Sequence, residues 1–125
     1  MTDRQLQGAK VLIVEDEYLI ADDLARMLSQ AGAILVGPVG TVEQAKRQLA
    51  HSGADAAVLD LNLRGDMAFS LAEELSARLP CVIVSGYGPA ALPESLAEIP
   101  ALEKPVDHHK VISLLAQQLG RGLPN

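Results

Sequence analysis

Polar side chains follow four apolar runs of this chain, and together they could form one reactive site. Glu15 and Asp16 follow VLIV, Asp60 ends AAVLD, Ser85 ends CVIVS, and Lys104 comes shortly after a short apolar pair. Neighbouring carboxylates repel one another, and each one that is buried without a cation costs several kcal/mol. Mg²⁺ prefers a few oxygen ligands, so it is the cation that such a cluster favours. The residue types therefore predict magnesium-assisted chemistry next to a hydroxyl and an ammonium group.

Each of these residues also has a simpler interpretation when it is taken singly. Acids at the start of a helix are common caps, Asp60 could be a turn residue, and Lys104 could be a solvated surface charge. Glu17 is expected to begin a helix, where the helix dipole stabilises a carboxylate, so it need not join the cluster. The shared position of the other residues, each at the end of a strand, favours one common site.

Predicted strands and helices alternate along the whole chain. Continuous apolar runs indicate buried strands, and apolar residues three and four apart indicate helices. The expected strands are 10–14, 33–36, 56–59, 81–84 and 101–102, and the four expected helices start near Glu17, Thr41, Phe69 and Asp107. Thr41 and Gln44 predict a capping box, while Pro89 and Pro93 allow only a short helical piece between the last two strands.

This alternation favours parallel strands that are joined by helical crossovers. The predicted fold is an α/β, doubly wound five-stranded sheet with helices on both faces. The second strand, which we expect to end at Gly37-Pro38, offers no polar side chain and fits an edge position. Ligands of such sheets bind outside the carboxyl ends of the strands, which is where Glu15, Asp16, Asp60, Ser85 and Lys104 would gather.

Composition and charge limit the class of protein. A chain of 125 residues suits one domain, which we place at residues 10–120 between tails at 1–9 and 121–125. The net charge of −6 argues against a nucleic-acid surface. Cys81 stands alone in an apolar run, so it is expected to be a small buried hydrophobe. No signal peptide or apolar run of about 20 residues is present, and we expect a cytoplasmic protein without a membrane span.

Four short stretches give the chain a family resemblance. They are VEDE after the first strand, VLDLNL around Asp60, VIVSG at the fourth strand and EKP after the fifth. Together they resemble the receiver domain of bacterial two-component response regulators over residues 10–120. The resemblance implies a flavodoxin-like strand order of 2-1-3-4-5. It also implies that Asp60 accepts a phosphoryl group from a sensor histidine kinase or a histidine phosphotransfer protein.

The resemblance also implies roles for the residues around Asp60. Asp16 would bind Mg²⁺ directly and Glu15 largely through water, with Asp60 and the backbone carbonyl of Asn62 as further ligands. Ser85 and Lys104 would bond the phosphoryl oxygens, and a cis peptide before Pro105 would aim the lysine into the site. Phosphoryl transfer needs this kind of positioning together with positive charge.

The region between the fourth and fifth strands is the expected switch. Similar receivers have an aromatic residue three positions before the lysine, where this chain has Ala101. The stretch IVSGYG partly matches a subgroup whose motif reads Phe-Ala-Thr-Gly-Tyr, with Ser85, Gly86 and Tyr87 at its last three positions. We expect residues 86–98 to be poorly protected until phosphorylation and Tyr87 to shield the acyl phosphate.

The expected protein is a stand-alone phosphorylated switch rather than a turnover enzyme, a monomer or weak dimer that binds a downstream protein. A phosphate sink or relay intermediate is an alternative with the same chemistry. An Mg²⁺-dependent phosphohydrolase is less favoured, because such enzymes carry a second acid where this chain has Asn62. A nucleotide- or flavin-binding domain would need a glycine-rich turn after the first strand, which this chain lacks. A receiver used only as a scaffold would lack some of the key residues, and all of them are present here.

Overall fold

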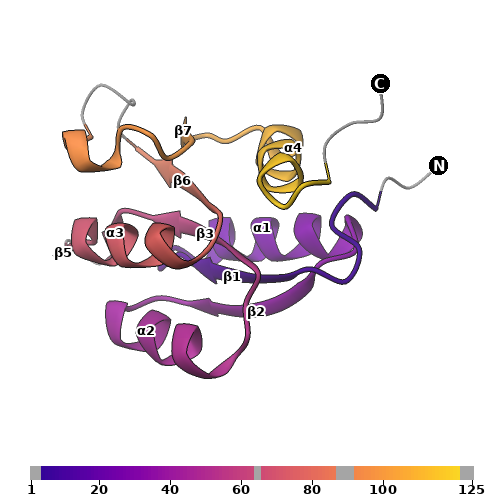
Figure 1. The fold of residues 1–125 in the computed structure, drawn as a ribbon, viewed down its shortest axis with the longest axis horizontal. Coiled ribbons are helices and arrows are strands. Elements are labelled where there is room, and N and C mark those ends of the chain that lie inside the picture. The colour runs from indigo at the N-terminus through magenta and orange to yellow at the C-terminus, as the bar shows by residue number, and fades with distance from the viewer. Residues whose placement is uncertain (1–3, 64–65, 87–91, 122–125) are drawn as a thin grey trace.

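A five-stranded parallel sheet forms the centre of the computed structural model, which describes residues 4–63, 66–86 and 92–121 (Figure 1). The strands lie in the order β2-β1-β3-β6-β7. Their bounds are β1 Lys10–Val14, β2 Ile34–Val39, β3 Ala56–Asp60, β6 Cys81–Ser85 and β7 Ala101–Glu103. With β6 and β7 as the fourth and fifth strands, the predicted flavodoxin-like order 2-1-3-4-5 is confirmed.

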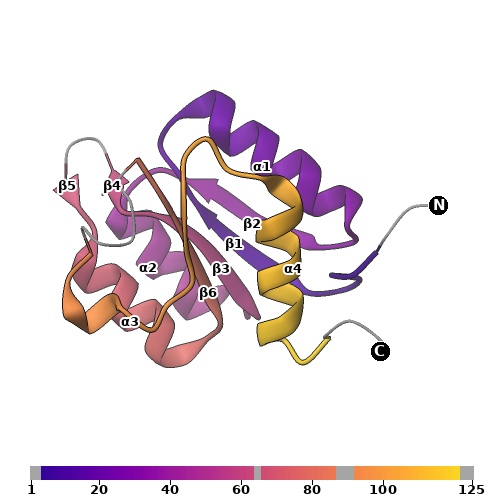
Figure 2. The same ribbon diagram turned by 90° about the horizontal axis from the view of Figure 1, so that it is seen from above.

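Helices cover both faces of this sheet, as Figure 2 shows from above. They are α1 Tyr18–Gln30, α2 Val42–His51, α3 Phe69–Arg78 and α4 His108–Gln118. Val11 and Ile13 of β1 pack in one buried cluster with residues of α1 and α4, whereas Leu12 and Val14 pack in a second cluster with α2 and α3. Successive side chains of a strand point to opposite faces of the sheet. Because helices bury both faces here, every residue of the run VLIV has to be apolar. Within the described ranges, no helix is long and apolar enough to cross a membrane.

Side-chain caps fix where two of the helices begin. The Thr41 hydroxyl accepts a hydrogen bond from the backbone N–H of Gln44 at 3.1 Å. The Gln44 side chain in turn accepts from the backbone N–H of Gly40 at 3.1 Å, one residue earlier than a standard capping box. Asp107 caps α4 as expected, accepting from the N–H of His109 at 2.9 Å.

Strand β2 continues past the point where we expected it to end. It runs through Gly37-Pro38 to Val39, whose carbonyl accepts a hydrogen bond from the N–H of Glu15 at 2.9 Å. Gly37 has a φ of +90°, and a Cβ there would lie 2.8 Å from the nitrogen of Val39. Glycine therefore allows the edge strand to bend and still reach the acidic end of β1.

The N-terminal segment is not the loose tail that we expected for residues 1–9. Leu6 is fully buried, and its N–H donates to the carbonyl of Ala31 at 2.9 Å. Gly8 donates in the same way to Gly32 at 2.9 Å. Gly32 has a φ of +95°, and a Cβ there would lie 2.8 Å from the Cα of Gln7. The prediction was wrong for residues 4–9, because two isolated apolar residues, Leu6 and Ala9, give no periodic signal in a polar stretch.

Two connections between parallel strands contain small elements of their own. A two-stranded hairpin that we did not predict, β4 Asn62–Leu63 and β5 Asp66–Met67, follows β3. A single 3-10 turn, η2 Glu94–Leu96, precedes β7 and is preceded by Pro93, in agreement with the short helical piece predicted there. Leu96 is fully buried and anchors this connection to the core.

Candidate active site

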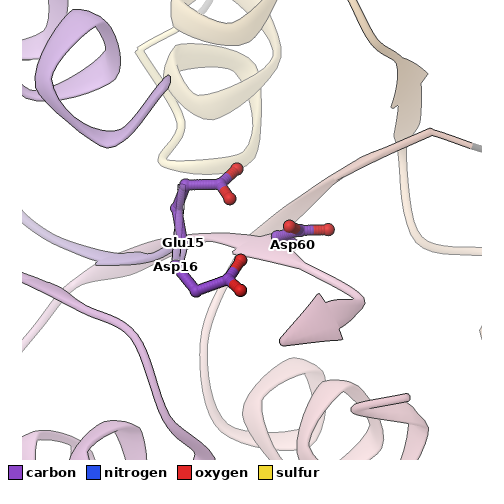
Figure 3. Close-up of side chains that lie close together, drawn as sticks. All are labelled: Glu15, Asp16 and Asp60. Atoms are coloured by element: carbon purple, nitrogen blue, oxygen red, sulfur yellow. The ribbon is translucent and has the colours of Figure 1, made fainter. Parts of the chain in front are cut away.

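Three carboxylates meet at the carboxyl ends of β1 and β3, which are neighbours in the sheet. Glu15 and Asp16 follow β1, and Asp60 is the last residue of β3. One carboxylate oxygen of each residue lies within 4.8 Å of those of the other two, and Figure 3 shows the three carboxyl groups close together. Glu15 and Asp60 are only 3% and 2% exposed, so their charges are largely withdrawn from water.

Lys104 supplies the positive charge that this cluster needs. Its Nζ lies 3.0 Å from Glu15 Oε1, 3.1 Å from Asp60 Oδ2 and 3.3 Å from Glu17 Oε1. The residue follows β7, and its backbone N–H donates to the carbonyl of Ser85 at 2.7 Å, which extends the pairing with β6. The Lys104-Pro105 peptide bond is cis, as the family resemblance implied.

Burial and mutual repulsion change the protonation of these groups. The pKa of Glu15 is raised from 4.5 to about 7. Burial is the largest cause and the neighbouring Asp60 adds to it, while the Glu17 N–H and Lys104 offset part of the rise. Burial by itself lowers the pKa of Lys104, but its contacts with Glu15 and Asp60 outweigh burial and raise this pKa. The lysine is therefore charged at neutral pH, whereas Glu15 is near its titration point.

The donor set fits a hard divalent cation. Glu15 Oε1 is close enough to Lys104 to pair with it as an ion, yet it accepts no hydrogen bond from residues 4–63, 66–86 and 92–121. A buried oxygen of this kind, beside two further carboxylates, is suited to a metal or to one of its water ligands. The cluster of Glu15, Asp16 and Asp60 therefore matches what Mg²⁺ requires.

Comparisons with known proteins agree with this geometry. Residues 11–116 match the family described as response regulator receiver domain. The chain belongs to this family. It is 33% identical over 113 residues to the sensory transduction protein LytT of Bacillus cereus, covering 85% of this chain and 45% of LytT. It is 32% identical over 125 residues to the sensory transduction protein RegX3 of Mycolicibacterium smegmatis, covering 92% of this chain and 52% of RegX3.

A solved structure shows the same fold. The CheY-like receiver domain of a response regulator from Methylobacillus flagellatus superposes with a TM-score of 0.73 at 28% identity, covering 84% of this chain and 93% of that one. The receiver described here spans about half the length of these two curated relatives, LytT and RegX3.

Other predicted site residues of the receiver lie around Asp60. The N–H of Asn62 donates to Asp60 Oδ1 at 3.1 Å. Ser85 is buried at the end of β6, next to β3 in the sheet. A cavity of about 270 Å³ is lined by Gly86 and Asn62 together with Asp60, Lys104 and Glu17. The carbonyl of Asn62 as a metal ligand stays a prediction.

The predicted switch residues are described only in part. Ala101 is half-buried at the start of β7 and pairs with Ile83 of β6. It stands where similar receivers have an aromatic residue. Tyr87 lies outside the described residues, so its shielding role and the motif of the subgroup stay predictions. The segment 86–98 is described at Gly86 and from Leu92 onward.

Glu17 is the site residue that our reading of the sequence missed. It precedes α1 with an extended backbone, and its side chain extends to Lys104 instead of serving only the helix. Its N–H also donates to Glu15 Oε2 at 3.1 Å. Three consecutive acids at a strand end, with a single lysine after the last strand, were the available signal. We had assigned Glu17 to the start of the helix, where the helix dipole stabilises a carboxylate, and therefore did not expect it at the site.

Proposed function

We propose that this receiver accepts a phosphoryl group on Asp60 from a phosphohistidine of a sensor histidine kinase or a histidine phosphotransfer protein. The observation that carries the proposal is the contact of buried Asp60 with Lys104, beside two more acids and an adjoining cavity. One carboxylate oxygen of Asp60 bonds to phosphorus while the bond from phosphorus to the histidine nitrogen breaks. The histidine leaves, and the product is an aspartyl phosphate.

The residues around Asp60 have distinct roles in this proposal. Glu15, Asp16, Asp60 and the carbonyl of Asn62 would hold Mg²⁺, which when bound neutralises charge on the phosphoryl oxygens. Lys104 moves part of its bonding from the carboxylates to a phosphoryl oxygen. The Ser85 hydroxyl donates a hydrogen bond to another phosphoryl oxygen, and this bond draws the end of β6 toward the site.

The output in this proposal is a change in protein binding at the β6–β7 region. A phosphoryl group adds close to two negative charges and three strong acceptors, so it can draw Ser85 toward the site and shift the position of the connection to β7. Half-buried Ala101 cannot supply the aromatic coupling of similar receivers. The connection that contains η2 therefore carries the signal. A relay role uses the same residues and differs only in which protein removes the phosphoryl group.

The test is to incubate the protein with Mg²⁺ and a small phosphodonor, acetyl phosphate or phosphoramidate, and to record its intact mass. We expect the mass of one phosphoryl group to be added, and none in the Asp60→Asn variant. Asp55→Asn is a matched control, because Asp55 lies just before the other end of β3, where it accepts from the N–H of Lys10. A wild-type protein that never gains this mass contradicts the proposal. Repeated release of phosphate from small monoesters would instead favour the phosphohydrolase.

A further inference from the structure

The three carboxylate partners of Lys104 differ greatly in their exposure to water. The side chains of Glu15 and Asp60 are 0% and 3% exposed, whereas that of Glu17 is 62% exposed. The Lys104 ammonium group donates hydrogen bonds to Asp60 Oδ2 at 3.1 Å and to Glu17 Oε1 at 3.3 Å, and it forms an ion pair with Glu15 Oε1 at 3.0 Å. A further anion that reaches Lys104 therefore competes with these three carboxylates for the same ammonium group.

Glu17 is the partner that costs least to release. Separating Lys104 from Glu15 or Asp60 would leave a buried carboxylate without its counter-charge. Glu17 would instead be hydrated by bulk water, and exposed ion pairs of this kind contribute little. Its contact is also the longest of the three.

Glu17 also lines the space that a phosphoryl group would enter. The cavity of about 270 Å³ is bounded by Glu17, Asp60, Asn62, Gly86 and Lys104. A group attached to Asp60 has to extend into this cavity, because Asp60 forms part of its wall. The incoming phosphoryl oxygens and the Glu17 carboxylate then meet the same lysine, and they carry charge of the same sign.

We propose that Glu17 is a positioning residue that accepts one hydrogen bond of Lys104 until a phosphoryl oxygen replaces it. In the meantime its charge slows the entry of anionic phosphodonors. This inference rests on the proposed function, since it assigns Glu17 to the same reaction. Glu17 thus sets how readily the receiver is phosphorylated without accepting the phosphoryl group itself.

Glu17→Gln tests the inference against Glu98→Gln, which changes the net charge equally. Glu98 is exposed and lies with Pro80 and Cys81 at the opposite end of β6 and β7. With acetyl phosphate and Mg²⁺ at low ionic strength, we expect Glu17→Gln to be phosphorylated roughly two- to fivefold faster than Glu98→Gln. The difference should shrink as salt screens the exposed charge.

A spectroscopic measurement reports on the site without phosphoryl transfer. Fluorine NMR of beryllofluoride bound to the protein should show tighter binding in Glu17→Gln than in Glu98→Gln or the wild type. Urea unfolding of each variant verifies that all are folded to the same extent.

The outcomes separate this inference from the proposed function. If all three proteins gain the phosphoryl mass at one rate, or Glu17→Gln is slower, the inference about Glu17 is wrong and the proposed function stands. Beryllofluoride affinities that are equal in the two variants also overturn the inference. If no protein gains the mass, the proposed function is wrong and the inference falls with it.

Discussion

Lys104 holds together charges that would otherwise repel one another inside the protein. Its Nζ lies within 3.1 Å of an oxygen of Glu15 and of an oxygen of Asp60. We expect Lys104→Met to lower the free energy of unfolding of the metal-free protein by about 3 kcal/mol at neutral pH, because two buried carboxylates lose their counter-charge. Chemical denaturation in the presence of a chelator measures this loss.

A matched lysine provides the control for that loss. Lys110 on α4 is exposed, and Lys110→Met should change the free energy of unfolding by no more than about 0.5 kcal/mol. Adding Glu15→Gln to Lys104→Met should recover part of the lost stability, since a neutral amide needs neither a counter-charge nor a proton at this buried position. Equal effects of the two lysine substitutions would show that Lys104 does not neutralise the cluster.

Glu15 should make the stability of the metal-free protein depend on pH. Its pKa is raised from 4.5 to about 7 in the folded state, so the folded protein keeps a proton that the unfolded chain releases. The resulting stabilisation is complete below pH 4.5 and is lost as the pH rises through 7. Urea unfolding from acid to neutral pH should show this decline, and Glu15→Gln should make it shallower. A variant with the wild-type slope would rule out Glu15 as the titrating group.

At the scale of elements, the segment before β1 is part of the core. Leu6 is fully buried against the end of α1, near Leu28 and Ala31 in the same cluster. Leu6→Ala should therefore cost about 2–4 kcal/mol of folding free energy, the usual range for a buried leucine. Leu19→Ala is the matched control, because Leu19 is 76% exposed on α1 and its loss should cost less than about 0.5 kcal/mol. Thermal or urea unfolding would compare them, and similar losses would contradict the packing of this segment.

The described part of the connection from β6 to β7, residues 92–100, contains the 3-10 turn η2. Within its described part, η2 is held by backbone hydrogen bonds between residues three apart, such as Leu96 to Pro93 at 2.9 Å. Such short turns have poorer hydrogen-bond geometry than an α-helix. Leu96 is buried in this described part, and Leu92 and Ile99 pack against the same core cluster, so three apolar residues attach it to the core.

At the scale of the molecule, the sheet brings together acids separated by 44 positions of sequence, from Asp16 to Asp60. Binding Mg²⁺ there should stabilise the folded state, by about 1.4 kcal/mol at about ten times its dissociation constant. Thermal unfolding should show a higher midpoint with MgCl₂ than with NaCl at the same ionic strength. Asp16→Asn should reduce this increase and Asp55→Asn should not. An increase that survives Asp16→Asn would place the cation elsewhere.

Most elements of the fold were predictable because their signals are local. The run VLIV, the caps Thr41 and Asp107, and the alternation of periodic segments each depend on neighbours in the sequence. Leu6 was missed because its partners, Leu28 and Ala31, lie more than twenty positions away. The bend at Gly37 was missed because glycine followed by proline ends most strands, and only the edge position allows this one to continue.

The sequence by itself determined which residue types stand at the strand ends, and hence the acidic cluster, its need for a cation and the family. Those features depend only on which residues follow one another along the chain, so they can be recognised without knowing the fold. Only the tertiary structure decided which carboxylates Lys104 contacts, and it brought exposed Glu17 to the lysine. The reason is physical: an ion pair depends on the direction and burial of side chains, and these are fixed only when β1, β3 and β7 lie together in one sheet.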